Sequence, residues 1–220
     1  MADTIKIGSL DISAFKVGSS DCKIYLGDTL LYPQTPSYTL LGGIERKEGY
    51  LGYVDLGLTV GTDFKIEVTL TYKTEAGGRF FGIDNTFRWF KAASKVYFDY
   101  NGEIISGTTS QGSSYYPLNT EITVTLTNFK YVSNLGGAKT GTTQTSYTPS
   151  GNLCLFSSNL SSNGDLGVFH GVKVYTNNGG TLVGDFIPVR MSSDNVVTMY
   201  NTVTNTFCTT SGTLYGVEIS

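Results

Sequence analysis

The sequence has few charged residues for its length. Only 15% of its 220 residues are Asp, Glu, Lys or Arg, and 15 basic side chains against 18 acidic ones give a formal net charge of −3. A nucleic-acid-binding protein needs a surplus of basic residues to neutralise phosphates, and an acidic disordered chain needs a surplus of acidic ones. The sequence has neither surplus, so both classes are excluded and no nucleic-acid partner is expected.

Histidine and cysteine, which often bind transition metals, are also scarce. His170 is the only histidine, and Cys22, Cys154 and Cys208 are widely spaced with no Cys-x-x-Cys pair. An odd number of scattered cysteines argues against both a disulfide framework and a zinc site. We therefore expect small buried thiols, a polar strand residue at position 170, and no bound metal or cofactor.

Long apolar runs are missing as well. No stretch approaches 18 consecutive apolar residues, and the first residues lack the basic region and apolar run of a signal peptide. We expect no membrane insertion and a protein that is made and kept in a cytoplasm.

Uncharged hydroxyl residues and glycine are abundant where most soluble proteins have charged residues. The chain contains 30 Thr, 21 Ser, 27 Gly and 15 Tyr, and 13% of its residues are aromatic. Threonine and tyrosine suit a pleated, half-buried surface, and glycine supplies turns. The composition therefore predicts an all-β protein.

The first part of the chain predicts a small β module over residues 1–33. Short apolar runs separated by turn residues predict strands at 5–7, 12–17, 22–26 and 30–32. About thirty residues cannot bury enough apolar surface to be stable alone, so this module must pack on another structure. Pro33 and Pro36 disfavour a helix, and residues 34–37 are expected to form a short linker.

Residues 38–220 carry the main core. Apolar and polar residues alternate strictly over 64–72 and 121–127, which predicts strands with one dry and one wet face. Looser alternation predicts further strands, separated by glycine and asparagine turns, at 95–100, 153–156 and 168–175. Many short strands without helical periodicity indicate an antiparallel two-sheet sandwich of the jelly-roll type.

Catalytic patterns are not evident. A glycanase needs two carboxylates on one face, and the nearest candidates are Asp99 with Glu103 and Glu45 with Glu48, which suit solvated turn charges better than acid/base roles. A serine or cysteine triad would depend on His170 alone, and neither a nucleophile elbow nor a phosphate-binding loop occurs. The sequence predicts a protein that is not an enzyme and offers no catalytic residues.

Aromatic residues offer candidates for sugar binding, because a flat ring can stack on the apolar face of a pyranose. The four candidates are Trp89, Tyr97, Tyr115 and Tyr116. Two alternatives stay open. Trp89 can instead point into the core at alternating strand positions, and the loop tyrosines suit a subunit interface equally well.

Several motifs together resemble one family. Residues 184–190 read GDFIPVR, 193–201 read SDNVVTMYN and 203–207 read VTNTF, and 52–57 read GYVDLG. These segments resemble the concanavalin A-like, or laminin-G-like, jelly rolls common in proteins of phages that infect gut Bacteroidetes. Asn195 stands where that pattern usually has glycine, and Asn201 where it usually has aspartate, which weakens any argument for calcium.

The N-terminal segment extends this resemblance. Residues 12–18, ISAFKVG, and 24–33, IYLGDTLLYP, are similar to a short module found on such phage virion proteins. The resemblance implies a head-fibre, tail-fibre or decoration protein of the virion, assembled in the host cytoplasm. Residues 1–33 would attach it to other phage structural proteins, through side chains that include Phe15, Ile24, Tyr25, Leu26, Leu31 and Tyr32.

The resemblance also implies a homo-oligomer, with a trimer favoured by analogy with fibre proteins, and possible adhesion to a host surface glycan. One alternative function is a dedicated carbohydrate-binding lectin for host adsorption. A divergent glycan hydrolase is the third.

Overall fold

A computed structural model describes residues 5–7, 10–12, 24–26, 29–32, 37–73, 78–84, 87–92, 95–101, 103–106, 116–128, 130–135, 138–140, 148–157 and 166–219. The chain divides into two compact units, Met1–Ser37 and Tyr38–Ser220. Within the described residues, no helix has the length and apolar character needed to cross a membrane.

The described residues of the N-terminal unit form two antiparallel strand pairs. β1 (Ile5–Ile7) pairs with β2 (Leu10–Ile12), and β3 (Ile24–Leu26) pairs with β4 (Thr29–Tyr32). Of the strand predicted over 12–17, only Ile12 is described, at the end of β2, and residues 13–17 lie outside the described residues. Phe15 lies outside the described residues. The other five residues predicted to attach the chain to a virion belong to β3 and β4: Ile24, Tyr25, Leu26, Leu31 and Tyr32.

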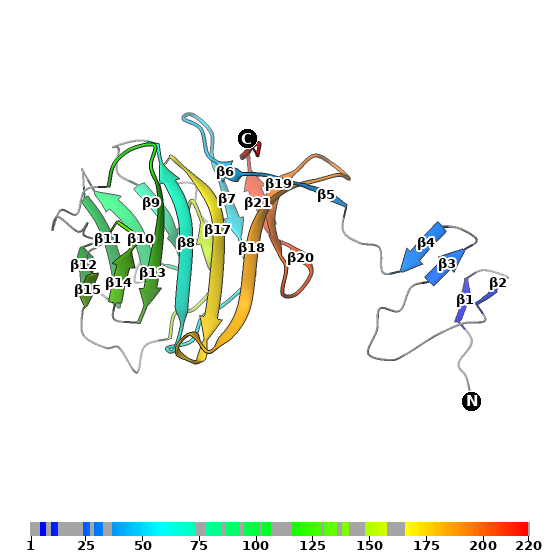
Figure 1. Ribbon diagram of the computed structural model, residues 1–220, viewed down its shortest axis with the longest axis horizontal. Helices are drawn as coiled ribbons and strands as arrows, with labels where there is room; N and C mark the ends of the chain where they lie inside the picture. Colours follow the sequence, from blue (N-terminus) through cyan, green and yellow to red (C-terminus); the bar gives the residue numbers. More distant parts are fainter. Residues whose placement is uncertain are drawn as a thin grey trace. The chain divides into compact units, whose positions relative to one another are not determined.

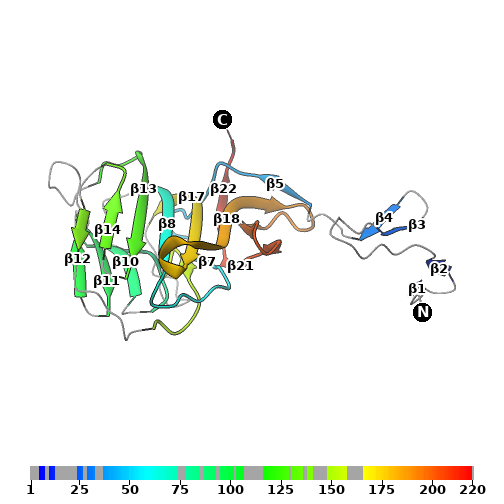
Figure 2. The same ribbon diagram turned by 60° about the horizontal axis from the view of Figure 1, so that its bottom comes forward.

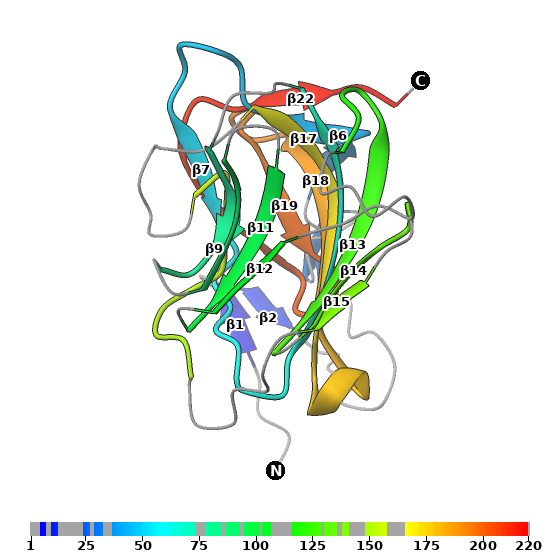
Figure 3. The ribbon, with the colours of Figure 1, turned by 90° about the vertical axis from the view of Figure 1, so that its left-hand side faces the viewer.

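The larger unit is a sandwich of two antiparallel sheets, which Figure 3 shows edge-on. The larger sheet has eleven strands in the described part of the chain. Eight of them run in the order β15 (Ala138–Thr140), β14 (Lys130–Ser133), β13 (Glu121–Thr127), β8 (Lys65–Tyr72), β17 (Gly167–Thr176), β18 (Thr181–Met191), β19 (Val197–Asn201) and β20 (Thr206–Phe207). The other three are β6 (Gly43–Glu45), β22 (Tyr215–Val217) and β5 (Tyr38–Leu40), which pair with β17, β6 and β18.

The smaller sheet has seven strands over the same described ranges. They run in the order β12 (Glu103–Ser106), β11 (Lys95–Tyr100), β10 (Phe87–Ala92), β9 (Gly78–Gly82), β16 (Cys154–Leu155), β7 (Gly52–Asp55) and β21 (Thr209–Gly212). Figures 2 and 3 show β11 and β12 across from β13 and β14 of the larger sheet. The predicted all-β, antiparallel two-sheet sandwich is confirmed.

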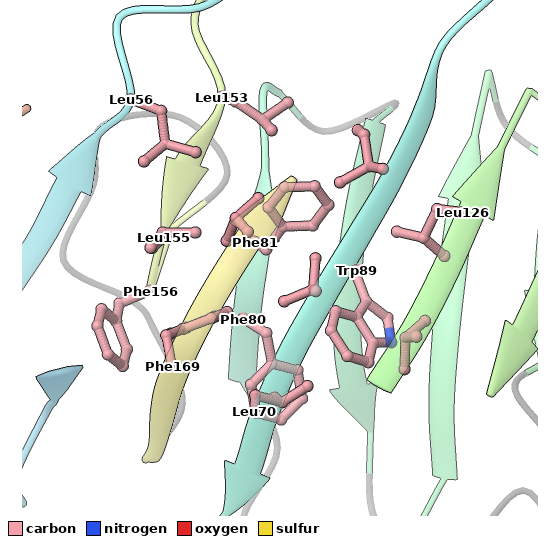
Figure 4. Close-up of a cluster of buried hydrophobic side chains, with 14 of the residues drawn as sticks. Leu56, Leu70, Phe80, Phe81, Trp89, Leu126, Leu153, Leu155, Phe156 and Phe169 are labelled. Atoms are coloured by element: carbon pink, nitrogen blue, oxygen red, sulfur yellow. The ribbon is translucent and has the colours of Figure 1, made fainter. Parts of the chain in front are cut away.

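The core lies between the sheets and follows the alternation in the sequence. In β8, Ile66, Val68 and Leu70 are fully buried, and Val68 pairs in register with the equally buried Val124 of β13. Burying such a side chain stabilises the fold by about 1.5–3 kcal/mol. β13 begins and ends where the alternating pattern does, at Glu121 and Thr127. Figure 4 shows how the inward side chains of both sheets meet.

Asparagine makes several of the tight turns. Asn177 and Asn178 have φ angles of 56° and 53° in the short 3-10 turn η1 (Asn177–Gly179) between β17 and β18. Asn101 has a φ of 54° between β11 and β12. Asn195, which stands where the resembling family usually has glycine, has a φ of 60°. Asparagine tolerates this left-handed region better than most other residues, so the turn survives the exchange.

Candidate functional site

Trp89 is a core residue. Its side chain is fully buried, and the rings of Phe80 and Tyr72 lie 5.6 and 6.1 Å from it between centroids. Figure 4 shows the indole between the two sheets. Positions 87 and 89 of β10 both point inward, as alternation requires. The hypothesis that Trp89 stacks on a sugar is therefore wrong, and the alternative, that Trp89 points into the core, is correct.

Tyr116 is buried as well, although it was expected in an exposed loop. Only 2% of its surface is exposed, and its ring centroid lies 5.9 Å from that of Tyr72 and 6.4 Å from that of Tyr131. Burial raises the pKa of Tyr116 and raises the pKa of Tyr131 well above its ordinary value. A sugar at the surface cannot reach this cluster, which corrects the prediction for Tyr116.

Tyr97 is the one half-exposed ring among the predicted candidates that the structure describes, since Tyr115 lies outside the described residues. Tyr97 stacks on Phe90 of the neighbouring strand, with 5.3 Å between centroids and 23° between ring planes. The guanidinium of Arg88 lies 4.7 Å from the centre of the Phe90 ring. The structure therefore does not gather Trp89, Tyr97 and Tyr116 into one surface.

Asp99 and Glu103, the nearest candidate pair for acid/base catalysis, lie on opposite faces of the smaller sheet. Asp99 pairs in register with Ile104, whereas Glu103 pairs with Tyr100, and neighbouring strand positions face opposite ways. Asp99 is buried, and its Oδ2 lies 3.1 Å from the Arg88 guanidinium. These two residues cannot share a substrate, so that pair is wrong.

The other acidic candidates also lack a site. Glu45 lies 3.3 Å from the ammonium group of Lys47, and Glu48 is exposed in the turn that follows β6, as expected of solvated turn charges. Among the described residues there is no group of three or more His, Cys, Asp or Glu side chains that could hold a metal ion.

His170 sits at a bulge on the outer face of the larger sheet. The register between β17 and β8 shifts between Phe169 and Gly171, so His170 is the extra residue. Its Nδ1 lies 2.6 Å from the Gly42 carbonyl oxygen, which can only accept, so Nδ1 carries the proton. Nε2 is then the acceptor for the Thr71 hydroxyl at 2.9 Å.

Beside this bulge the outer face is hollowed above a glycine. The hollow has a volume of about 340 Å³, and Gly171, Glu67, Thr123 and Asp185 are among the residues that line it. Each acidic group of the hollow forms an ion pair with a nearby lysine: Asp185 lies 4.0 Å from Lys173, and Glu67 lies 2.8 Å from Lys65. The described residues that line this sheet-face hollow include the His170 imidazole but no Trp or Tyr, and their one Phe side chain, Phe186, is buried.

A second and larger cavity lies at one edge of the sandwich. It has a volume of about 430 Å³ and is lined by the end of β7 with the residues that follow it, the segment before β16, the β19–β20 hairpin and the start of β21. Figure 1 shows β19, β20 and β21 at the edge opposite β12 and β15. We call it the edge cavity.

Asp55 supplies the carboxylate of the edge cavity. Its Oδ1 accepts a hydrogen bond from the backbone N–H of Gly57 at 2.8 Å, and its Oδ2 accepts one from Nδ2 of Asn152 at 3.3 Å. Gly57 has a φ of 64°, a conformation that favours glycine and lets the chain turn back on Asp55. The carboxylate is held by two neutral donors, and each oxygen keeps a lone pair for a further donor.

Asn201 supplies a donor from a buried position. The residue is only 5% exposed, and its Oδ1 accepts hydrogen bonds from the backbone N–H of Val203 at 3.0 Å and of Asp185 at 3.3 Å. These contacts fix which end of the carboxamide is oxygen. Its Nδ2 donates no hydrogen bond to any described residue, and Asn201 lines the edge cavity.

Phe207 supplies a partly exposed aromatic ring. Its centroid lies 5.1 Å from that of Tyr200 and 6.0 Å from that of Tyr38, which pack behind it. The Tyr200 hydroxyl donates to Oδ1 of Asn205 at 3.2 Å and so ties down the hairpin. The ring is therefore held in place before any ligand arrives.

Cys208 completes one wall of the edge cavity. Burial, with a smaller contribution from the charge of Asp55, raises the pKa of its thiol to about 12. The thiol is therefore neutral at physiological pH, and it contributes shape rather than reactivity.

The sequence reasoning did not identify this cavity. Asp55, Asn201 and Phe207 belong to segments that were interpreted as fold motifs, and Asn152 was not singled out. A usable signal was present, because Asp55 and Asn201 are polar residues at the ends of apolar strands. What the sequence could not show is that these two ends meet.

Comparisons with known proteins bear on the fold. No protein-family model matches the chain, and no curated protein matches its sequence. The structure is similar to a crystal structure from Bacteroides ovatus of a protein described as a "putative carbohydrate binding protein", with a TM-score of 0.55 and 10% sequence identity. The match covers 82% of this chain and 61% of that protein, so this chain spans less than two thirds of its length. At this identity the likeness shows the sandwich fold alone.

Proposed function

We propose that the sandwich is a carbohydrate-binding domain that holds a saccharide in the edge cavity. Sugars present hydroxyl groups, which both donate and accept hydrogen bonds, around an apolar ring face. The edge cavity offers acceptors on Asp55 and Asn152, a donor on Asn201 and a ring on Phe207. The main support for this proposal is Asn201, a buried residue at the cavity wall whose Nδ2 donates no hydrogen bond to any described residue.

The chemistry of the two hollows favours the edge cavity over the sheet-face hollow. In the sheet-face hollow the charged groups contact one another, and the described lining residues include no exposed Phe, Tyr or Trp ring. In the edge cavity the carboxylate has only neutral neighbours and a ring lies beside it. The described fold neighbour supports carbohydrate binding as a class, and it favours this function over a purely structural one.

A matched pair of substitutions tests the proposal. Asp55→Asn and Asp185→Asn each remove one negative charge with almost no change in shape, one in the edge cavity and one in the sheet-face hollow. On an array of bacterial and host glycans, we expect the wild-type chain and Asp185→Asn to bind the same saccharides. We expect Asp55→Asn to bind them at least about 10-fold more weakly, the loss of one charge-assisted hydrogen bond.

The opposite result overturns this assignment. If Asp185→Asn loses binding and Asp55→Asn keeps it, the saccharide lies on the sheet face. If the folded wild-type chain binds no glycan at all, the domain is not a carbohydrate-binding one. Circular dichroism and thermal unfolding of each variant establish that the fold is intact.

The glycan-hydrolase alternative has lost its leading pair of acids, because Asp99 and Glu103 lie on opposite faces. Hydrolysis of a bound polysaccharide that persists in Asp55→Asn would revive it with other residues. Reducing-end assays on the array ligands provide this check.

We also propose, from the resemblance to phage proteins, that residues 1–33 attach the sandwich to a virion as part of a trimer. The supporting observation is that Met1–Ser37 and Tyr38–Ser220 are separate compact units. Light scattering on the full chain and on a chain lacking residues 1–37 tests it. A trimer that persists without the first unit, or a full chain that is monomeric, would contradict this assignment.

A further inference from the structure

The electrostatics of the edge cavity bear on which sugars it can accept, if it binds sugars as proposed. The described residues that line it include one carboxylate, Asp55, and no Lys or Arg. Within the described residues Asp55 forms no ion pair, and both of its oxygens are bonded to neutral groups, the Gly57 N–H and the Asn152 carboxamide. The negative charge in the cavity is therefore not cancelled at short range.

A second observation points the same way. The pKa of the Cys208 thiol is raised first by burial and then by the charge of Asp55. Burial and the charge of Asp55 both disfavour a negative charge in this cavity. An acidic ligand would encounter the same two effects, desolvation and repulsion, and would find no cation among the lining residues to offset them.

The donor and acceptor pattern specifies what is accepted. Asn201 directs hydrogens and not a lone pair to the cavity, because its Oδ1 is used by the backbone N–H groups of Asp185 and Val203. Asp55 offers only lone pairs. A neighbouring pair of hydroxyl groups fits both, since one can accept from Asn201 while the other donates to Asp55. A carboxylate fits Asn201 and is repelled by Asp55.

The cavity volume limits the size of the ligand. About 430 Å³ is near the lower end of the range of about 300–1,000 Å³ usual for ligand pockets. Phe207 lies at one wall with Tyr200 and Tyr38 packed behind it, so the ring face cannot retreat to admit a larger group. The volume suits a short saccharide better than a wide polymer surface.

We infer that the edge cavity selects uncharged sugars that present adjacent hydroxyl groups, and rejects acidic sugars such as uronates. This inference rests on the proposed function and adds the class of ligand. The selectivity comes from Asp55 acting without a cation, in a cavity whose remaining polar groups are neutral.

Pairs of sugars that differ mainly in one charge provide the test. We would measure dissociation constants by NMR titration at pH 7 for methyl glycosides of glucose and glucuronate, galactose and galacturonate, and mannose and mannuronate. In at least one pair we expect the neutral sugar to bind and its uronate to bind about 100-fold more weakly, or not measurably. Since the uronate is ionised at this pH, the difference reports the charge.

Two variants separate charge from shape. Asp55→Asn removes the repulsion, so the ratio within a pair should fall to within a few-fold while the neutral sugar also weakens. Thr206→Lys places a cation at the exposed rim of the cavity, where it does not disturb the core, and should improve uronate binding by about 10-fold. Thermal unfolding confirms that both variants fold.

The outcomes separate the two proposals. In one outcome, the wild-type chain binds a uronate as tightly as the neutral sugar while Asp55→Asn binds both more weakly. This result overturns the selectivity and keeps the carbohydrate site. A ratio that neither variant changes also overturns it. A folded chain that binds none of these sugars and no glycan on the array overturns both.

Discussion

Asn152 and Asp55, which lie 97 positions apart in the sequence, are joined by a hydrogen bond of 3.3 Å from Nδ2 to Oδ2. The bond connects the segment before β16 to the end of β7 and orients the carboxylate within the edge cavity. The other oxygen is held by the N–H of Gly57. Asp55 is therefore positioned from two directions before it meets a ligand.

Removing this hydrogen bond should weaken ligand binding more than it weakens the fold. We expect Asn152→Ala to cost about 1 kcal/mol of stability and to reduce saccharide affinity about 5- to 10-fold, because Asp55 loses one of the two hydrogen bonds that orient it and the cavity loses the acceptor on Asn152. Titration calorimetry and urea unfolding measure the two effects. Asn134→Ala is the matched control, since the Asn134 side chain accepts a comparable bond from the Thr123 N–H at 3.0 Å, and Asn134 does not line the edge cavity. Equal loss of affinity in both variants would contradict the positioning role.

The single tryptophan reports directly on the corrected assignment of Trp89. Because its side chain is fully buried, we expect blue-shifted emission that iodide does not quench and that added saccharide does not change. Trp89→Ala should destabilise the sandwich by about 3–5 kcal/mol, and Trp89→Phe by clearly less, because a ring still fills most of the space. Quenching by iodide in the folded protein would show that the indole is at the surface after all.

The Cys208 thiol should react slowly. With its pKa raised to about 12, almost none of it is thiolate at pH 8, so we expect alkylation at least about 100-fold slower than for a free cysteine. Asp55→Asn removes one cause of the raised pKa and should accelerate the reaction. Peptide mapping after timed exposure to iodoacetamide distinguishes Cys208 from the other two cysteines.

The same shift makes a prediction about stability and pH. Between pH 9 and about 12 the thiol ionises in the unfolded chain but not in the folded one, so the unfolded chain binds fewer protons and stability falls as the pH rises. Cys208→Ala should lessen this decline. An unchanged pH profile, together with rapid alkylation of the folded wild-type chain, would contradict the burial of the thiol.

Two glycines near the His170 bulge should respond in opposite ways to alanine. A Cβ at Gly43 would overlap Cγ1 of Val168 and approach Nδ1 of His170 to 3.2 Å, so Gly43→Ala should cost about 1–3 kcal/mol. A Cβ at Gly171 would meet nothing closer than the Phe186 carbonyl oxygen at 3.6 Å. Gly171→Ala should therefore be neutral or slightly stabilising. Urea unfolding of both variants tests this, and equal destabilisation would contradict the packing at the bulge.

Strands with a strict alternating pattern could be predicted from the sequence almost to the residue. The run at 121–127 became β13 with the same bounds, and the run at 64–72 became β8, which begins one residue later. Local chemistry is enough there, because one buried face per strand requires period two. The turn asparagines were predictable for the same local reason.

Features that depend on partners far away in the chain could not be predicted. The bulge at His170 arises from a shift in register against β8, which the local pattern over 168–175 does not reveal. The segment 153–156 has no wet face at all, since Leu153, Cys154, Leu155 and Phe156 are all buried under neighbouring strands and loops. The burial of Tyr116 likewise depends on Tyr72 of β8 and Tyr131 of β14. The candidate site belongs with these features, because each of its side chains comes from a different strand end.

The edge cavity can form only late in synthesis of the chain, because one of its walls is the hairpin that carries Asn201 and Phe207. A ribosome adding about 5–20 residues per second needs roughly 7 to 30 seconds to proceed from Asp55 to Asn201. During that interval Asp55, and later Asn152, have been synthesised, but we expect the chain to be unable to retain a ligand. Ligand capture would thus begin only as synthesis ends, and a chain that stops before β19 would lack it.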